Sequence, residues 1–312
     1  MIVSLILGKS NYLYAFEEIL GEKIIRCKDK QEALKVLSEA EIIITIGGGE
    51  HAIPMDAEMV NAAEKLKWIF CVSAGFEKLP MKELHQKGVL VNNTSGVHAG
   101  TISEYVLGGM LAFSHHYNTF MKNQIKSVWY PILPSEDLDG KTICIIGAGK
   151  IGGEIGKKAK AFDMNVIGIK KHPETLPNFD QVVGTDKLPE VLEISDYVVL
   201  VTPLTDETYH LMGKDEFDKM KESAVFINVS RGDTVDEEAL VSCLQGNQIR
   251  GAVLDVFHSE PLPKDNPLWN LDNVILTPHS AGISKNTTRK IIALFKENVN
   301  RYKNHQTLIN QI

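Results

Sequence analysis

The chain has few cysteines, no long hydrophobic run and no excess of positive charge. Its four cysteines are scattered without the spacing of a metal site, so we interpret them as buried free thiols. The apolar run Ile2 to Leu7 is too short for the core of a secretory signal, and no later run is long enough to span a membrane. We therefore expect a cytoplasmic protein.

The charge and the composition exclude further classes of protein. A formal net charge of −7 argues against a general binder of nucleic acid or anionic membranes, although a local basic patch could still hold a phosphate. No internal repeat of solenoid period is visible. With 44% hydrophobic and 23% charged residues the chain can form sizeable cores, and its 312 residues favour two domains over one.

Short apolar runs alternate with helix-patterned segments along the chain, which predicts an α/β architecture with parallel sheets. We expect two doubly wound parallel-sheet domains, one formed by residues 1–98 plus 283–312 and one inserted over residues 99–282. The predicted strands of the first domain are Val3 to Leu7, Ile24 to Cys27, Ile42 to Ile46, Trp68 to Val72 and Val89 to Asn92. Those of the second are Thr142 to Ile146, Val166 to Ile169, Tyr197 to Val201, Ala224 to Val229, Gly251 to Leu254 and Val274 to Leu276.

Two long helices are predicted beside these strands. An apolar helix covers about Thr101 to Met121, and the last helix covers about Ser284 to Tyr302 and returns to the first domain. The chain would then cross between the domains near His98 and near Gly282. We expect these two crossings to form a hinge over a cleft.

The most specific local pattern is Gly147-Ala148-Gly149-Lys150-Ile151-Gly152, because it lies between an apolar run and a helix-like segment. Gly147 permits a tight strand-to-helix turn, Gly149 leaves space for phosphates, and Gly152 lets the helix pack closely on the strand. The free N–H groups at the helix N-terminus favour an anion. Alone, the pattern could be a glycine-rich turn, but the flanking strand and helix predict a dinucleotide site.

Three predicted strands end near residues that could act together in catalysis: Arg231, Glu260 and His279. Ligands of open α/β sheets bind outside the carboxyl ends of the strands, so these side chains are expected to converge on one site. Arg231 can form two hydrogen bonds to a substrate carboxylate or keto oxygen. His279 can donate a proton to a forming alkoxide, and Glu260 would stabilise its charged form. This combination suits the reduction of a carbonyl group.

The alternatives to these roles are structural. Arg231 would be a surface ion-pair residue, His279 a hydrogen-bonded structural histidine, and Glu260 the start of a turn. Four other histidines have no comparable setting, and we interpret them as structural or solvated: His98, His115, His116 and His258.

With these motifs in place, the chain resembles the D-isomer-specific 2-hydroxyacid dehydrogenase family over nearly its whole length. The resemblance rests on five segments that occur in order: Gly147 to Gly152, Val201 to Thr208, Asn228 to Gly232, Gly251 to Glu260 and Pro278 to Gly282. Their joint occurrence is far more specific than any one motif. The resemblance implies a flavodoxin-like substrate domain, an inserted Rossmann nucleotide-binding domain, and a homodimer to which the helix after Thr101 contributes.

The resemblance also implies roles for individual residues. Arg231 would bind the substrate, His279 would be the acid/base, and Glu260 would be its partner. Ala74 and Gly75, in the stretch Ser73-Ala74-Gly75, would present backbone N–H groups to the substrate carboxylate; alternatively they only form a turn. Asp255 would lie near the nicotinamide. The residues implied to line the cofactor site are Thr202, Pro203, Thr208, Val229, Asp255 and Ala281.

One position departs from the pattern of an NAD-selective site. Such a site places Asp or Glu about 20 residues beyond the glycines to accept the ribose hydroxyls. This chain has Lys170 and Lys171 there, and lysines attract a 2′-phosphate that a carboxylate would repel. We therefore predict that NADP(H) is favoured over NAD(H). Alternatively, the lysines are a solvated pair at a strand end, or the loop accepts both cofactors.

The sequence thus predicts an NADPH-preferring reductase that converts a small 2-keto acid, such as glyoxylate, hydroxypyruvate or a pyruvate-like acid, to the D-2-hydroxy acid. Residues 47–51 and Trp129-Tyr130, the latter from a partner subunit, are expected in the substrate pocket. A long-form phosphoglycerate dehydrogenase is disfavoured because no regulatory domain follows Ile312. A formate dehydrogenase is disfavoured because Glu260 with His279 suits hydroxy-acid chemistry better. The alternative function is a dinucleotide-sensing scaffold or corepressor of the same fold.

Overall fold

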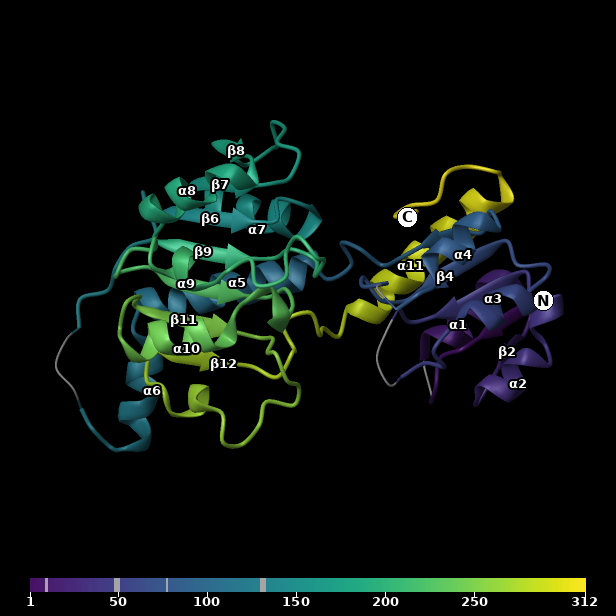
Figure 1. Ribbon diagram of the computed structural model, residues 1–312, viewed down its shortest axis with the longest axis horizontal. Helices are drawn as coiled ribbons and strands as arrows, with labels where there is room; N and C mark the ends of the chain where they lie inside the picture. The colour runs from purple at the N-terminus through teal and green to yellow at the C-terminus, as the bar shows by residue number, and fades with distance from the viewer. Residues whose placement is uncertain (9–10, 48–50, 77, 130–132) are drawn as a thin grey trace. The chain divides into compact units, whose positions relative to one another are not determined.

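The computed structural model describes residues 1–8, 11–47, 51–76, 78–129 and 133–312. Two segments expected in the substrate pocket therefore lie partly outside the described residues, Gly48 to Glu50 of one and Tyr130 of the other. The chain divides into two compact units, labelled by element in Figure 1. One comprises Met1–Val97 and Ser284–Ile312, and the other comprises His98–Ile283.

The first unit is built on a five-stranded parallel sheet in the order β2-β1-β3-β4-β5. The order is that of a flavodoxin-like sheet, as the resemblance implies. Its strands are β1 Ile2–Ser4, β2 Ile24–Arg26, β3 Ile42–Thr45, β4 Trp68–Cys71 and β5 Leu90–Asn92. Its α-helices are α1 Asn11–Leu20, α2 Lys30–Leu34, α3 Ala57–Ala62, α4 Met81–Gln86 and α11 Thr287–Lys303.

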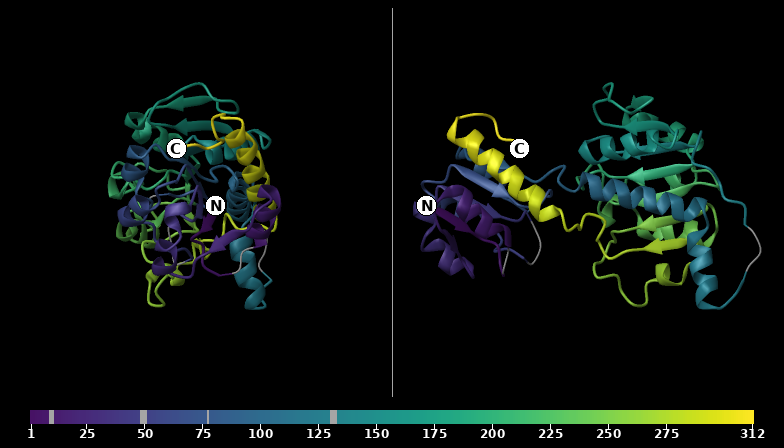
Figure 2. Two further views of the ribbon diagram at one scale, coloured as in Figure 1. Left: turned by 90° about the vertical axis from the view of Figure 1, so that its right-hand side faces the viewer. Right: turned by 180° about the vertical axis from the view of Figure 1, so that it is seen from behind.

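The last helix, α11, packs along α1 on the sheet of this unit (Figure 2). Its Phe295 stacks on Phe16 of α1 with 3.8 Å between the ring centroids. The same ring contacts Trp68 and Phe70 of β4, whose side chains are fully buried. Because buried aromatic rings supply much of a core's apolar area, the C-terminal helix completes the core that the N-terminal strands begin.

The second unit contains a seven-stranded parallel sheet in the order β12-β11-β10-β9-β6-β7-β8. This is the Rossmann order with one further strand, and the strand order reverses at β6, where such sheets bind their ligands. Its strands are β6 Thr142–Ile146, β7 Asn165–Ile169, β8 Gln181–Val183, β9 Tyr197–Leu200, β10 Val225–Asn228, β11 Gly251–Leu254 and β12 Val274–Leu276. Its α-helices are α5 Ala99–Ser114, α6 Tyr117–Ile125, α7 Lys150–Lys160, α8 Leu188–Ile194, α9 Lys214–Phe217 and α10 Glu237–Gln245.

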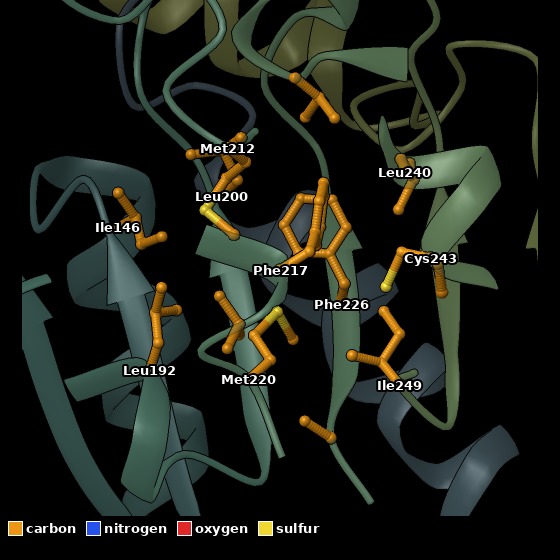
Figure 3. Packing of buried hydrophobic residues seen from close by; sticks show 14 of the residues in the cluster. Ile146, Leu192, Leu200, Met212, Phe217, Met220, Phe226, Leu240, Cys243 and Ile249 are labelled. Carbon is orange, nitrogen blue, oxygen red and sulfur yellow. The ribbon is translucent and has the colours of Figure 1, made fainter. Parts of the chain in front are cut away.

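Helices cover both faces of this sheet, so its strands are apolar on both sides. In β6, Ile143 and Ile145 belong to the core under α5 and α7, and Cys144 and Ile146 to the core under α8 to α10. Figure 3 shows the second core, in which Phe217 of α9 meets Phe226 of β10 edge-on. The architecture confirms the predicted fold class of two doubly wound parallel sheets. All four cysteines are buried and free, as predicted.

Two details of the prediction are wrong. The single helix over Thr101 to Met121 is two helices, because His116 adopts a left-handed backbone with φ 56° between α5 and α6. The strand β8 was not predicted, because its three residues are only partly buried and carry little apolar signal. Within the described ranges, no helix is long and apolar enough to cross a membrane.

Candidate active site

The glycine turn between β6 and α7 has the geometry of a phosphate cradle. Gly147 has φ 108°, and a Cβ built on it would lie 2.8 Å from the Val201 carbonyl oxygen. A Cβ on Gly152 would lie 2.4 Å from the Gly147 oxygen, so any side chain would push α7 away from the turn. A Cβ on Gly149 meets nothing within 4 Å. The N-terminus of α7 at Lys150 and Ile151, which has no acidic residue in its first turn, is thus open to an anion.

The loop after β9 offers an unsatisfied polar atom beside this turn. Within the described part of the chain, the hydroxyl oxygen of Thr202 is buried and has no hydrogen-bond partner. A buried polar atom of this kind normally has a partner, so the site fits a polar ligand such as a dinucleotide. The hydroxyl of Thr208 closes the loop by donating to the Pro203 carbonyl at 2.6 Å and accepting from the Thr205 N–H at 2.8 Å. Thr208 thus shapes the loop that the sequence assigned to the cofactor.

Lys170 and Lys171 follow β7 directly and lie at the carboxyl edge of the sheet. Lys170 is paired with Glu174, and the Lys171 ammonium donates to both carboxylate oxygens of Glu207 at 2.6 and 2.8 Å. The sequence analysis identified the lysines but neither glutamate partner.

The three predicted catalytic side chains follow three adjacent strands. Arg231 comes after β10, Glu260 after β11 and His279 after β12, and these strands are neighbours in the sheet. Arg231 is partly buried, and its guanidinium donates to the Ser230 carbonyl oxygen at 2.8 Å. Its own carbonyl oxygen accepts the Thr234 hydroxyl at 2.6 Å, which fixes the backbone from which the guanidinium extends.

A glycine brings two of these loops together. A Cβ on Gly232 would lie 2.0 Å from the carbonyl atoms of Phe257, so the backbone after Arg231 packs directly against the backbone that leads to Glu260. The contact is reinforced by the His258 imidazole, which lies 2.5 Å from an Asp233 carboxylate oxygen. Only glycine permits this approach.

Glu260 and His279 form a direct pair. The Nδ1 atom of His279 lies 2.7 Å from a carboxylate oxygen of Glu260, whose other oxygen accepts the Phe257 N–H at 3.1 Å. A proton on Nδ1 is therefore directed at Glu260, and Nε2 is left for a substrate. The His279 side chain is 50% exposed, as a group that exchanges protons with a ligand requires.

The backbone of His279 is held by Asp255. The residue has φ 50°, and its N–H donates to the Asp255 carbonyl oxygen at 2.8 Å. The Asp255 carboxylate accepts the N–H groups of Ser280 and Ala281 at 2.8 and 2.9 Å and the Thr277 hydroxyl at 2.6 Å. These bonds define the turn that presents the imidazole. Asp255 is implied as a nicotinamide neighbour, and in this structure its carboxylate orders the turn that carries His279.

Tyr105 of α5 extends this network. Its hydroxyl lies 2.7 Å from the Thr277 hydroxyl oxygen, and because Thr277 donates its own proton to Asp255, Tyr105 is the donor. Burial raises the pKa of Tyr105 to about 12. Sequence reasoning missed Tyr105 and Thr277. The signal available in the sequence was the position of Asp255 directly after the apolar strand Gly251 to Leu254, because a carboxylate buried there needs several donors nearby.

The predicted carboxylate-binding turn lies after β4 in the first unit. Its carbonyl groups have partners: Ala74 accepts the Asn93 side-chain amide at 2.7 Å, and Gly75 accepts the Ser73 hydroxyl at 2.7 Å. Among the residues that the structure describes, no acceptor contacts the N–H groups of Ala74 and Gly75. The turn thus offers two adjacent donors.

Cavities of the second unit differ in their chemistry. One of about 560 Å³ is lined by Glu260 and His279 together with apolar side chains such as Trp269 and Leu262. A larger one of about 680 Å³ lies against Tyr209, His210 and α10 and is lined by neither Glu260 nor His279. The smaller cavity is thus the one that contains the Glu260–His279 pair. Val229 and Ala281, implied at the cofactor site, are both buried.

Comparison with known proteins agrees with this geometry. Residues 107–281 match the family model described as "D-isomer specific 2-hydroxyacid dehydrogenase, NAD binding domain". The chain belongs to this family. As an NAD(P)-dependent D-2-hydroxyacid dehydrogenase it is an enzyme, and the resemblance seen in the sequence is confirmed.

Similar proteins include two curated relatives and one solved structure. A glyoxylate reductase of Korarchaeum cryptofilum is 34% identical over 271 residues, which cover 83% of this chain and 80% of the relative. A hydroxypyruvate reductase of Thermotoga maritima is 32% identical over 267 residues, 84% of this chain and 85% of the relative. The structure of an acyclic imino acid reductase, Bsp5, in complex with NADPH and D-Arg is 27% identical, with a TM-score of 0.84 and full coverage of both chains.

Proposed function

We propose that this dehydrogenase is an NADPH-preferring reductase that forms the D-2-hydroxy acid from a small 2-keto acid. The observation that carries the proposal is the Glu260–His279 pair at 2.7 Å, which leaves one imidazole nitrogen directed away from the carboxylate. It is supported by Arg231 on the adjacent loop and by the unpartnered Thr202 hydroxyl at the cofactor turn.

Each residue has a distinct part in the proposed reaction. A bound nicotinamide cofactor supplies the hydride that adds to the keto carbon. Protonated His279 transfers its Nε2 proton to the carbonyl oxygen as that oxygen gains negative charge, and Glu260 orients the imidazole through its contact with Nδ1. Arg231 binds the carboxylate or keto oxygen of the substrate. The ketone, hydride and proton together give the alcohol.

The preference for NADPH rests on Lys170 and Lys171, which occupy the strand end where an NAD-selective site carries an acidic residue. The relative Bsp5, which binds NADPH, supports the same choice. Among substrates we propose glyoxylate, hydroxypyruvate or a pyruvate-like acid, because two relatives are named for the first two.

We also propose that the enzyme works as a cytoplasmic homodimer. The helix α6 has no buried residue, and its apolar side chains Phe120, Met121 and Ile125 are 39%, 66% and 85% exposed. An apolar helix face of this size fits a protein partner, and a second copy of the chain is the occupant we propose.

The test is a panel of 2-keto acids with purified protein and NADPH, followed at the nicotinamide absorbance. Loss of absorbance with one acid supports the proposal and names the substrate. A second panel with ammonia or methylamine distinguishes an imine reductase, because only that activity depends on the amine. Tight NADPH binding with no turnover in either panel would support the dinucleotide-sensing scaffold instead.

A further inference from the structure

Both lysines expected to receive a 2′-phosphate already hold a carboxylate. Lys170 is paired with Glu174, and Lys171 is bound by both oxygens of Glu207. The Lys170 ammonium lowers the pKa of Glu174, so this carboxylate is charged at neutral pH. The anion site predicted from the lysines is therefore already occupied by groups of the protein itself.

The Lys171–Glu207 pair joins the two loops that lie on either side of the strand leading into the glycine turn. Lys171 follows β7 and Glu207 lies in the loop after β9, and these two strands flank β6 on either side. The loop that carries Glu207 is closed by the Thr208 hydroxyl, which bonds the Pro203 carbonyl and the Thr205 N–H. Glu207 is thus held on a shaped loop at the carboxyl edge of the sheet.

A phosphate monoester and a carboxylate compete for the same ammonium group. The 2′-phosphate of NADPH carries more negative charge than a carboxylate, so it can replace Glu174 and Glu207 as a partner. When the phosphate replaces a glutamate, one ion pair is lost and another is formed. The net gain in binding free energy is therefore smaller than for an unpaired lysine. The neutral 2′-hydroxyl of NADH has no charge with which to displace either glutamate.

We propose that Glu174 and Glu207 are specificity-determining residues that compete with the cofactor 2′-phosphate for Lys170 and Lys171. The wild-type protein consequently binds both NADH and NADPH, with a preference for NADPH that the glutamates restrain. This inference rests on two parts of the proposed function, a nicotinamide dinucleotide as the cofactor and the binding of its 2′-phosphate by Lys170 and Lys171.

The test measures ligand binding without any keto acid. Titration calorimetry at fixed ionic strength compares wild type with Glu207→Gln and Glu174→Gln, using NADPH, NADH, adenosine 2′,5′-bisphosphate and adenosine 5′-monophosphate. Each variant should bind the two 2′-phosphate ligands about 3- to 10-fold more tightly, the scale of one exposed ion pair. NADH and adenosine 5′-monophosphate should change by less than about twofold, because neither replaces a glutamate.

Two further variants exclude a general effect of charge. Glu190→Gln removes the same charge from an exposed pair with Lys187 on the same unit and should leave all four affinities unchanged. Adding Lys171→Gln to Glu207→Gln should abolish the gain, because the lysine that the phosphate would use is gone. Thermal unfolding of each variant checks that the fold is intact.

The possible outcomes separate this inference from the proposed function. Equal strengthening of NADH and NADPH, or no change in either, would overturn the competition. Selective strengthening of 2′-phosphate ligands in a protein that turns over no keto acid would support the competition and refute the reductase. Turnover of a keto acid with NADPH, together with unchanged affinities in the glutamate variants, would support the reductase and refute the competition.

Discussion

The two ends of the site on the nucleotide-binding unit hold their charged groups in opposite ways. At the end that carries His279, Asp255 is 2% exposed, and its carboxylate accepts three hydrogen bonds that define the turn of His279. At the other end, Lys171 and Glu207 are 62% and 67% exposed and bind each other at the surface. A buried, fully bonded carboxylate is costly to disturb, whereas an exposed pair exchanges partners at little cost. One end therefore fixes geometry, and the other can discriminate between ligands.

The largest effect that we expect is a loss of turnover when His279 is replaced. The variant His279→Ala should lower turnover by about 100-fold or more, because the proton donor is lost. Its affinity for NADPH should stay within about threefold of wild type, because the pyrophosphate is held by the glycine turn and α7. Steady-state kinetics and calorimetry on the same preparation measure the two quantities.

A matched control uses His258, which lies on the adjacent loop and pairs with Asp233. The variant His258→Ala removes an exposed histidine of the same unit and should retain most of the turnover. If His279→Ala kept near-normal activity, the acid/base role would be refuted.

The second effect is on stability, at Asp255. In Asp255→Asn one carboxylate oxygen becomes an NH₂ group, so a donor would face one of the donors Ser280 N–H, Ala281 N–H or the Thr277 hydroxyl. The free energy of unfolding should fall by about 1–3 kcal/mol, the cost of an unsatisfied buried group. Turnover should fall with it, because the His279 turn loses its anchor.

Denaturant unfolding followed by far-ultraviolet circular dichroism measures this loss. The variant Tyr105→Phe removes only the hydroxyl that donates to Thr277 and leaves all three donors to Asp255, so it should cost less than Asp255→Asn. Equal stability of wild type and Asp255→Asn would show that this carboxylate does not order the turn.

The fold could be predicted because a parallel sheet buried on both faces leaves a continuous apolar signal, as in Ile42–Thr45 and Trp68–Cys71. The break at His116 could not, because no glycine or proline marks the left-handed residue between α5 and α6. The strand Gln181–Val183 was missed because it is short and partly exposed.

In the site, too, some features leave a signal in the sequence and others do not. The contact between Glu260 and His279 could be predicted because each follows a recognisable strand, and topology brings the ends of neighbouring strands together. The Lys171–Glu207 pair joins residues 36 positions apart on two loops, and no periodicity predicts such a contact. Tyr105, which donates to Thr277, was missed for a similar reason, since it lies on a distant helix.

The third effect is on cofactor affinity, at the exposed end. Replacing Lys170 and Lys171 with glutamine should weaken NADPH binding by about two- to fivefold for each lysine, because a phosphate contact of about 1 kcal/mol at most replaces an existing ion pair with a glutamate. NADH binding should change little, because its ribose carries no phosphate. Michaelis constants for both cofactors measure the selectivity. Equal weakening of both would mean that the lysines do not recognise the 2′-phosphate.

The smallest effect concerns the exposed His258, whose pKa is raised above its usual 6.5 mainly by the hydrogen bond to Asp233 and further by the charges of Asp233 and Glu237. The folded state therefore keeps the proton at a pH where the unfolded state has lost it. The His258–Asp233 pair contributes its full stabilisation of the folded state below pH 6.5. This contribution disappears as the pH rises through the raised pKa of His258. His258→Gln should melt up to about 2 °C below wild type at pH 5–6, as for an exposed pair, and match it at alkaline pH. Melting curves of both proteins from pH 5 to 9 measure this difference. A difference that stayed constant or grew with pH would show that the Asp233 contact does not couple to the protonation of His258.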